Sequence, residues 1–146
     1  MPMDDDEELI VERIEAFDIT FSRPEFWSFR REHDETYLYW DEDAGSMRVT
    51  PFATTIDIDH YLAEVFEKER DHDAAWRSIE GRKGVAWISD DGDSRSHFYV
   101  TGRDDLVILC SYAYDTAIYA EDDEFYAPAV DAGLEQFEAA LASMRF

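Results

Sequence analysis

The segment that most constrains the fold is the apolar run at residues 106–110 (LVILC), which continues as an alternating pattern to Tyr114. Five successive apolar residues leave no polar face on an extended strand, so both faces need a covering layer. Such a strand lies at the centre of a sheet, between helices. A turn sequence at residues 102–105 and a strand pattern at residues 97–101 precede it, which predicts two antiparallel neighbours.

Shorter segments rich in aromatic and β-branched residues predict further strands, because these side chains suit a pleated surface. They lie at residues 17–21, 27–31, 36–41, 47–52, 76–80 and 85–89. Turn sequences at residues 43–45 and 90–93 separate neighbouring strands. The second contains an Asp-Gly pair, which tolerates the positive φ of tight turns. The order predicts an antiparallel meander.

Three segments have the spacing of helices. The clearest is 58–70, where Asp57 is the expected N-cap and the apolar residues fall on one stripe: Ile58, Tyr61, Leu62, Val65 and Phe66. A last helix is expected to open at Pro128, with Val130, Leu134, Phe137, Leu141 and Met144 toward the core. A short helix is predicted for residues 9–17, behind a cap at Asp6.

A chain of 146 residues with 45% apolar residues has the size and the core of one domain. The first eight residues include five acids and are expected to fray. The predicted organisation is an acidic N-terminal extension at residues 1–16, carrying the short helix, and a single α+β domain at residues 17–146.

The order of these elements resembles the PsbP-like fold superfamily, an α/β/α sandwich shared by a photosystem accessory protein, a yeast Mog-type Ran-binding protein and small bacterial members. The residues that carry the resemblance are the motif at 21–27 (FSRPEFW), the helix after Asp57, the meander at 87–114 and the closing segment at 141–146. The resemblance implies an antiparallel sheet flanked by helices, on a scaffold that binds and rarely catalyses. It implies no functional residue.

The net charge of −23, from 36 acidic and 13 basic residues, excludes several classes of function. Such a surface repels phosphate backbones and anionic bilayers, so we expect no nucleic-acid and no membrane partner. No apolar run approaches 18 residues, and the acidic start lacks the features of a signal peptide. The single cysteine, Cys110, has no disulfide partner. These features predict a cytoplasmic protein.

No catalytic or metal-binding pattern is present. The four histidines, His33, His60, His72 and His97, lack the short regular spacing of zinc ligands and are expected to be solvated surface residues. An EF-hand that begins at Asp90 or Asp91 would need Glu at its twelfth position, which is Thr101 or Gly102. Cys110 lies in an apolar strand, as a small hydrophobe with a raised pKa. We predict no enzyme, no cofactor and no metal ion.

Acids interleaved with aromatic rings are the remaining signal, in the turns at 90–93 and 104–105 and in a predicted loop at 115–126. Two interpretations of the loop rings stay open: contact area for a partner, or packing on the core beneath. Our hypothesis for the partner-binding face comprises Asp90, Asp91, Asp93, Asp104, Asp105, Tyr119, Glu121, Asp122, Asp123, Glu124 and Tyr126.

Charge, size and the lack of a catalytic pattern together favour a binding protein for a basic protein partner, of the immunity, antitoxin or adaptor type, with a toxin as one such partner. One alternative is a salt-adapted housekeeping protein, whose acids serve a saline environment. Another is a small-ligand-binding domain with a pocket between sheet and helix. The oligomeric state is left open.

Overall fold

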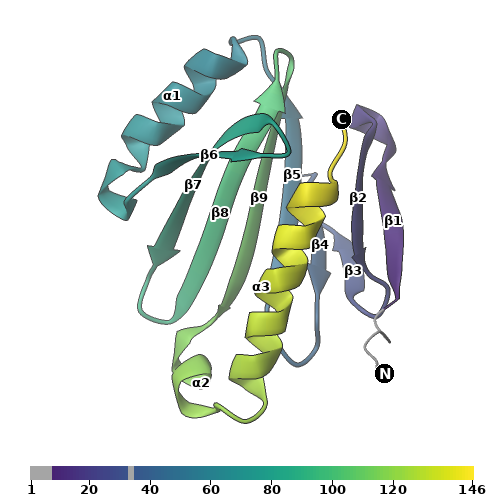
Figure 1. Cartoon of the computed structure of the whole chain (residues 1–146), viewed down its shortest axis with the longest axis vertical. Helices are drawn as coiled ribbons and strands as arrows, with labels where there is room; N and C mark the ends of the chain where they lie inside the picture. Colours follow the sequence, from purple (N-terminus) through teal and green to yellow (C-terminus); the bar gives the residue numbers. More distant parts are fainter. Residues whose placement is uncertain (1–7, 33–34) are drawn as a thin grey trace.

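The computed structural model describes residues 8–32 and 35–146. These residues form one large twisted sheet, a separate two-stranded sheet and three α-helices, arranged as in Figure 1. The strands are β1 (Leu9–Ile14), β2 (Ile19–Pro24), β3 (Ser28–Arg31), β4 (Tyr37–Trp40), β5 (Ser46–Ala53), β6 (Ala75–Ile79), β7 (Arg82–Asp90), β8 (Ser94–Arg103) and β9 (Leu106–Asp115). The helical segments are η2 (Glu15–Phe17), α1 (Ile58–Lys68), η3 (Arg70–His72), α2 (Thr116–Glu121) and α3 (Tyr126–Ser143).

The large sheet has seven strands in the order β3-β4-β5-β9-β8-β7-β6, and every pairing is antiparallel. On β9, Ile108 and Cys110 pack toward Phe137 of α3 on one face. Val107 belongs to the cluster of Leu62 of α1 on the other face. The run at residues 106–110 is therefore central and covered on both sides, as its composition predicts. The α+β class and the α/β/α sandwich are confirmed (Figure 1).

The prediction of a helix over residues 9–17 is wrong. Residues 9–14 form β1, which pairs with β2 along its whole length and ends at Ile14 opposite Ile19. Only the last three residues form a single 3-10 turn, η2, closed by Asp18 at φ 55°. The segment is rich in β-branched residues, and pairing with β2 stabilises a strand that the helical spacing alone does not reveal. The expected cap Asp6 and the fraying of residues 1–7 lie outside the described residues.

The other two predicted helices are present, with shifted ends. The Asp57 carboxylate caps α1 by accepting a bond from the backbone N–H of His60 at 3.4 Å, as expected, but the helix ends at Lys68 rather than Arg70. Helix α3 begins at Tyr126, so Pro128 lies in its first turn, where a missing N–H leaves no helical bond unmade. The predicted loop at 115–126 contains the short helix α2, because the Asp115 carboxylate caps the backbone N–H of Ile118 at 2.8 Å.

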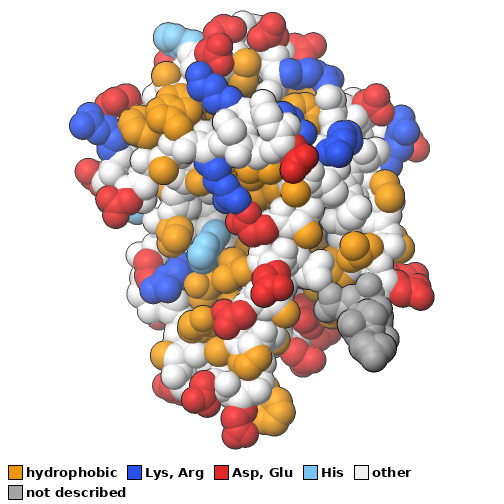
Figure 2. All heavy atoms as spheres, viewed as in Figure 1, with side chains coloured by type: hydrophobic (Ala, Val, Ile, Leu, Met, Phe, Trp, Pro, Cys, Tyr) orange, Lys and Arg blue, Asp and Glu red, His pale blue; other side chains and the backbone are white. Residues whose placement is uncertain are grey.

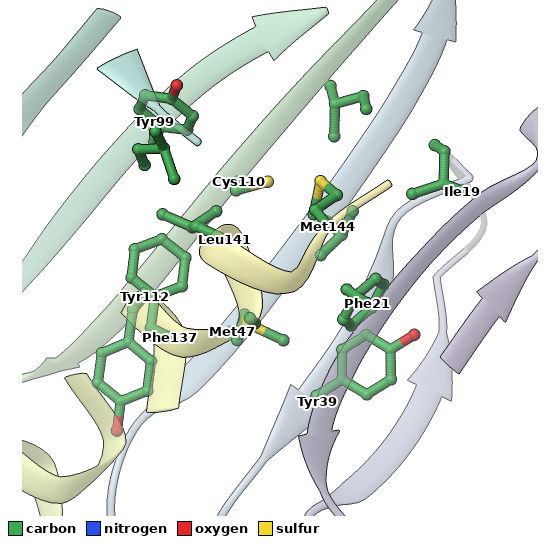
Figure 3. Close-up of a cluster of buried hydrophobic side chains, with 14 of the residues drawn as sticks. Ile19, Phe21, Tyr39, Met47, Tyr99, Cys110, Tyr112, Phe137, Leu141 and Met144 are labelled. Atoms are coloured by element: carbon green, nitrogen blue, oxygen red, sulfur yellow. The ribbon is translucent and has the colours of Figure 1, made fainter. Parts of the chain in front are cut away.

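The main core lies between α3, the β1–β2 sheet and the centre of the large sheet (Figure 3). Its largest fully buried side chains include Tyr39 and Tyr112, which come from β4 and β9, the strands on either side of β5. Cys110 lies among them with no exposed surface, and burial raises the pKa of its thiol to about 12. The expectation that Cys110 serves as a small hydrophobe is confirmed.

The hydroxyl of Tyr39 is buried without a hydrogen-bond partner within residues 8–32 and 35–146. A buried polar group without a partner costs about 1–3 kcal/mol. We therefore expect Tyr39→Phe to leave the free energy of unfolding unchanged or to raise it by about 1 kcal/mol, measured by urea denaturation. The matched control is Tyr112→Phe, which removes a hydroxyl that accepts a bond from the N–H of Gly45 at 3.1 Å. That change should lower stability by about 1 kcal/mol, and the reverse ranking would contradict the argument.

Candidate binding site

The structure divides the predicted site residues between the two ends of the sheet. The turn at residues 90–93 joins β7 to β8 and lies beside α2, at the end where β9 finishes (Figure 1). Asp104 and Asp105 lie in the turn between β8 and β9, at the opposite end of two ten-residue strands. Ten residues span roughly 33 Å, so the two groups do not form one face.

The turn at residues 90–93 is fixed to the start of α2. The backbone N–H and the hydroxyl of Thr116 donate to the carbonyl oxygens of Asp93 and Gly92, at 3.1 and 3.2 Å. The Asp91 carboxylate accepts from the backbone N–H groups of Ser94 and Asp93, at 2.8 and 3.0 Å, and these bonds lower the pKa of that carboxyl. The predicted hairpin turn is therefore ordered by its own acids.

The segment after α2 leaves its carboxylates in solvent. Asp122 accepts a bond from the backbone N–H of Phe125 at 3.0 Å and so shapes the connection to α3. Glu121, Asp123 and Glu124 are exposed and make no ion pair within the part of the chain that the structure describes. No Lys or Arg occurs anywhere in residues 104–144. The negative potential of this segment is therefore not neutralised by its own sequence.

Two hydrophobic side chains lie exposed among these acids. The exposed fractions are 75% for Phe125 and 46% for Ile118, and both border a hollow of about 470 Å³ with Asp43 and Tyr126. Figure 2 shows orange and red side chains around α2 and the start of α3, and blue ones over the adjacent β7–β8 hairpin. Sequence reasoning missed Ile118 and Phe125. The sequence signal that could have identified them is an apolar residue that lies in an acidic segment and belongs to no core-facing stripe of a helix.

The predicted site tyrosines have structural contacts. Tyr119 packs against Tyr114 with 5.2 Å between ring centroids and donates to Asp131 at 2.9 Å. The hydroxyl of Tyr126 accepts from the backbone N–H of Asp115 at 2.8 Å. These contacts hold α2 and α3 against β9. The geometry of Tyr119 and Tyr126 fits packing on the core beneath them. The surface of this segment that is exposed for contact with a partner comes from neighbouring side chains.

A second hollow, of about 660 Å³, lies between α3 and the β7–β8 part of the sheet. Its apolar lining includes Ala86, Ile88 and Phe137, and a histidine and hydrophobic side chains are visible beside α3 in Figure 2. Two ion pairs also line it. Arg77 pairs with Glu138, and Arg95 binds Asp90 through Nε at 3.0 Å and Nη2 at 2.9 Å.

His97 lies in this second hollow, and the expectation of solvated surface histidines is wrong for it. The ring is half-buried, and its Nε2 lies 3.2 Å from the hydroxyl of Tyr114. Burial, and then the nearby charge of Arg95, lower the pKa of His97. His60 and His72 are on the surface, beside Glu64 and Glu69, while His33 lies outside the described residues. No group of three or more potential metal ligands occurs in the described ranges.

Comparison with known proteins places the architecture in the PsbP-like fold class. The solution structure of cyanobacterial PsbP (CyanoP) from Synechocystis sp. PCC 6803 matches with a TM-score of 0.55 and 11% identity, over 95% of this chain and 92% of that one. A crystal structure from Bacteroides thetaiotaomicron VPI-5482 matches with a TM-score of 0.67 and 15% identity, over 95% of this chain. This chain spans only 48% of that bacterial protein.

The sequence itself matches no family model and no curated protein. The shared fold is therefore what the comparisons establish, and a fold alone does not define a function. Among the described helices, none combines the length and hydropathy needed to cross a bilayer.

Proposed function

We propose that this protein is a non-catalytic binding protein that docks a basic protein partner on its acidic end. The acidic end comprises Asp91, Asp93, Ile118, Glu121, Asp122, Asp123, Glu124 and Phe125. The observation that carries the proposal is the exposure of Phe125 and Ile118 in a segment whose carboxylates, Glu121, Asp123 and Glu124, make no ion pair among the residues that the structure describes. Exposed aromatic anchors surrounded by charge are typical of protein interfaces.

In this proposal the net charge, the exposed carboxylates and Phe125 have different roles in binding. A net charge of −23 attracts a cationic partner from a distance, and such steering raises association rates by about 10- to 10³-fold. The unpaired carboxylates then orient the partner. Burial of Phe125 in the interface slows dissociation of the partner. A toxin with a cationic active site is one partner of this kind, and the protein would then act as an immunity or antitoxin protein in the cytoplasm.

The test compares two variants with the same change in net charge. We expect Asp123→Lys/Glu124→Lys to slow association with the basic partner by about tenfold and to weaken its salt dependence. Asp104→Lys/Asp105→Lys, at the opposite end of the sheet, should change the rate by less than about threefold. The partner is the basic protein that the wild type retains on a column, chosen before either variant is tested. Stopped-flow mixing at several salt concentrations measures the rates.

A neutral substitution separates contact from charge. Phe125→Ser keeps every charge, so it should leave the association rate unchanged and raise the dissociation rate by about tenfold. Equal losses in the two charge variants would show that only net charge matters and would overturn the assigned end. If the stability of the free protein rises steeply with salt as well, that result would favour the salt-adapted alternative.

A further inference from the structure

Half of strand β7 lacks a neighbour on its outer side. Strand β6 pairs with β7 only as far as Ala75 opposite Ala86, while β8 pairs with β7 as far as Asp90. Residues 87–90 therefore form a free edge, visible in Figure 1 where the lower part of β7 is the margin of the sheet. No other described backbone group bonds to this outer side. The edge presents unpaired N–H and C=O groups.

A hollow lies on each face of the sheet beside this edge. On the α3 face is the 660 Å³ hollow, which Ile88 lines together with His97 and Phe137. On the α1 face is a hollow of about 360 Å³, lined by Trp87 and by Val65 of α1, among others. Successive side chains of an extended chain point to opposite faces. A strand added beside β7 would place its side chains alternately in the two hollows.

The free edge has few of the features that normally prevent strand pairing. Residues 87–90 contain neither Pro nor Lys, and Ile88 has 48% of its surface exposed. Asp90 carries their single charge, and its carboxylate is bound to Arg95. The 3-10 turn η3 lies near the edge, because Asp71 of η3 and the adjacent Asp73 line the same hollow as Ile88. No backbone hydrogen bond joins η3 to residues 87–90.

We propose that the free edge at residues 87–90 accepts an extended, basic segment of the protein partner by strand addition, in line with β6. The inference rests on the proposed function, because it assigns a second contact of the same partner. Main-chain bonds would supply affinity, and the two hollows would select alternate side chains.

The charges of the larger hollow favour a basic segment, while the smaller hollow carries one Lys and one Glu, Lys68 and Glu69. Both arginines of the larger hollow are engaged, Arg77 with Glu138 and Arg95 with Asp90. Asp71 and Asp73 make no ion pair among the residues that the structure describes, so the lining keeps an excess of negative charge. A second copy of this chain, with its own net charge of −23, is repelled at the same place.

The experiment measures amide hydrogen exchange at residues 87–90 by NMR, with the wild-type protein and a defined probe. The probe is an end-capped octapeptide of alternating Arg and Val. The control peptide has the same sequence with its six central amides N-methylated, which keeps the charge and removes the main-chain donors. We expect the first peptide to slow exchange of the outward-pointing amides by about tenfold or more, and the second to have no effect. Equal effects of both peptides, or none at these residues, would overturn the proposal.

Two matched substitutions separate this inference from the proposed function. Ile88→Arg at the edge and Ile118→Arg at the acidic end replace the same residue type at similar exposure, 48% and 46%. Ile88→Arg should raise the Kd of the probe peptide by about tenfold, whereas Ile118→Arg should leave the protection at residues 87–90 intact. If Ile118→Arg weakens binding of the partner and Ile88→Arg does not, strand addition is refuted and the proposed interface at the acidic end is retained. Protection that rises with protein concentration alone would assign the edge to a second copy and overturn the proposal.

Discussion

Replacing Arg23 by methionine is expected to lower the free energy of unfolding by about 2–4 kcal/mol. The guanidinium donates to Glu12 at 2.9 Å and to the carbonyl oxygens of Pro24 and Trp27, at 3.1 and 3.0 Å. It also lies over the ring of Tyr39, 5.1 Å from its centroid. Breaking a buried ion pair costs about 3–5 kcal/mol, and the estimate is lower here because the Glu12 side chain keeps 21% of its surface in solvent.

Arg13 supplies the matched control on the same pair of strands. It bonds to Asp18 at 2.7 Å, but its side chain is 59% exposed. We therefore expect Arg13→Met to change stability by less than about 1 kcal/mol in the same urea titration. The double variant Arg23→Met/Glu12→Leu should recover part of the loss, because no uncompensated charge then remains. Equal effects of Arg13→Met and Arg23→Met would refute the role assigned to the buried pair.

Replacing Gly133 by alanine is expected to destabilise the protein by about 1–3 kcal/mol, although alanine is the better helix former by about 1 kcal/mol. Gly133 lies in the middle of α3, against the ring of Tyr112. A β-carbon at this position would overlap the Tyr112 hydroxyl and lie 2.7 Å from the ring carbon Cζ. The ring cannot yield easily, because its hydroxyl is held by the N–H of Gly45.

A double-mutant cycle with Tyr112→Phe tests this explanation. The phenylalanine removes the overlapping oxygen, so Gly133→Ala should cost less in the Tyr112→Phe background than in the wild type. We expect only part of the stability to be recovered, because the ring carbon Cζ of residue 112 stays close to the new β-carbon at residue 133. Thermal and urea unfolding of the four proteins give the coupling energy. A stabilising effect of Gly133→Ala in the wild type would mean that α3 shifts to accommodate the methyl group.

The motif at residues 21–27 shows why a weak sequence resemblance identified the fold. Phe21 and Trp27 are buried in the main core, and Arg23 joins β1, β2 and the start of β3 through its hydrogen bonds. These residues attach the small β1–β2 sheet to the large one. They are structural, so their agreement with the PsbP-like fold carries no information about a partner.

The candidate site was only partly predictable. Runs of acids located Asp91, Asp93 and residues 121–124 directly, because charge is a local property of the sequence. Their separation from Asp104 and Asp105 follows from strand length and hairpin order in the folded sheet. The exposure of Phe125 depends on how α2 and α3 close the end of the sheet, which no local pattern encodes.

The α+β class, the central position of β9, the capped helix α1 and the burial of Cys110 were all predictable from local sequence patterns. Each follows from the pattern of apolar residues along a short segment, because that pattern indicates which faces of a strand or helix are buried. Three features became evident only in the folded protein: residues 9–14 form a strand, His97 lines a hollow, and β7 extends beyond β6. These features depend on contacts between segments, namely the β1–β2 and β6–β7 hairpins and the packing of α3 beside β8, and the energy of those contacts outweighs local preference.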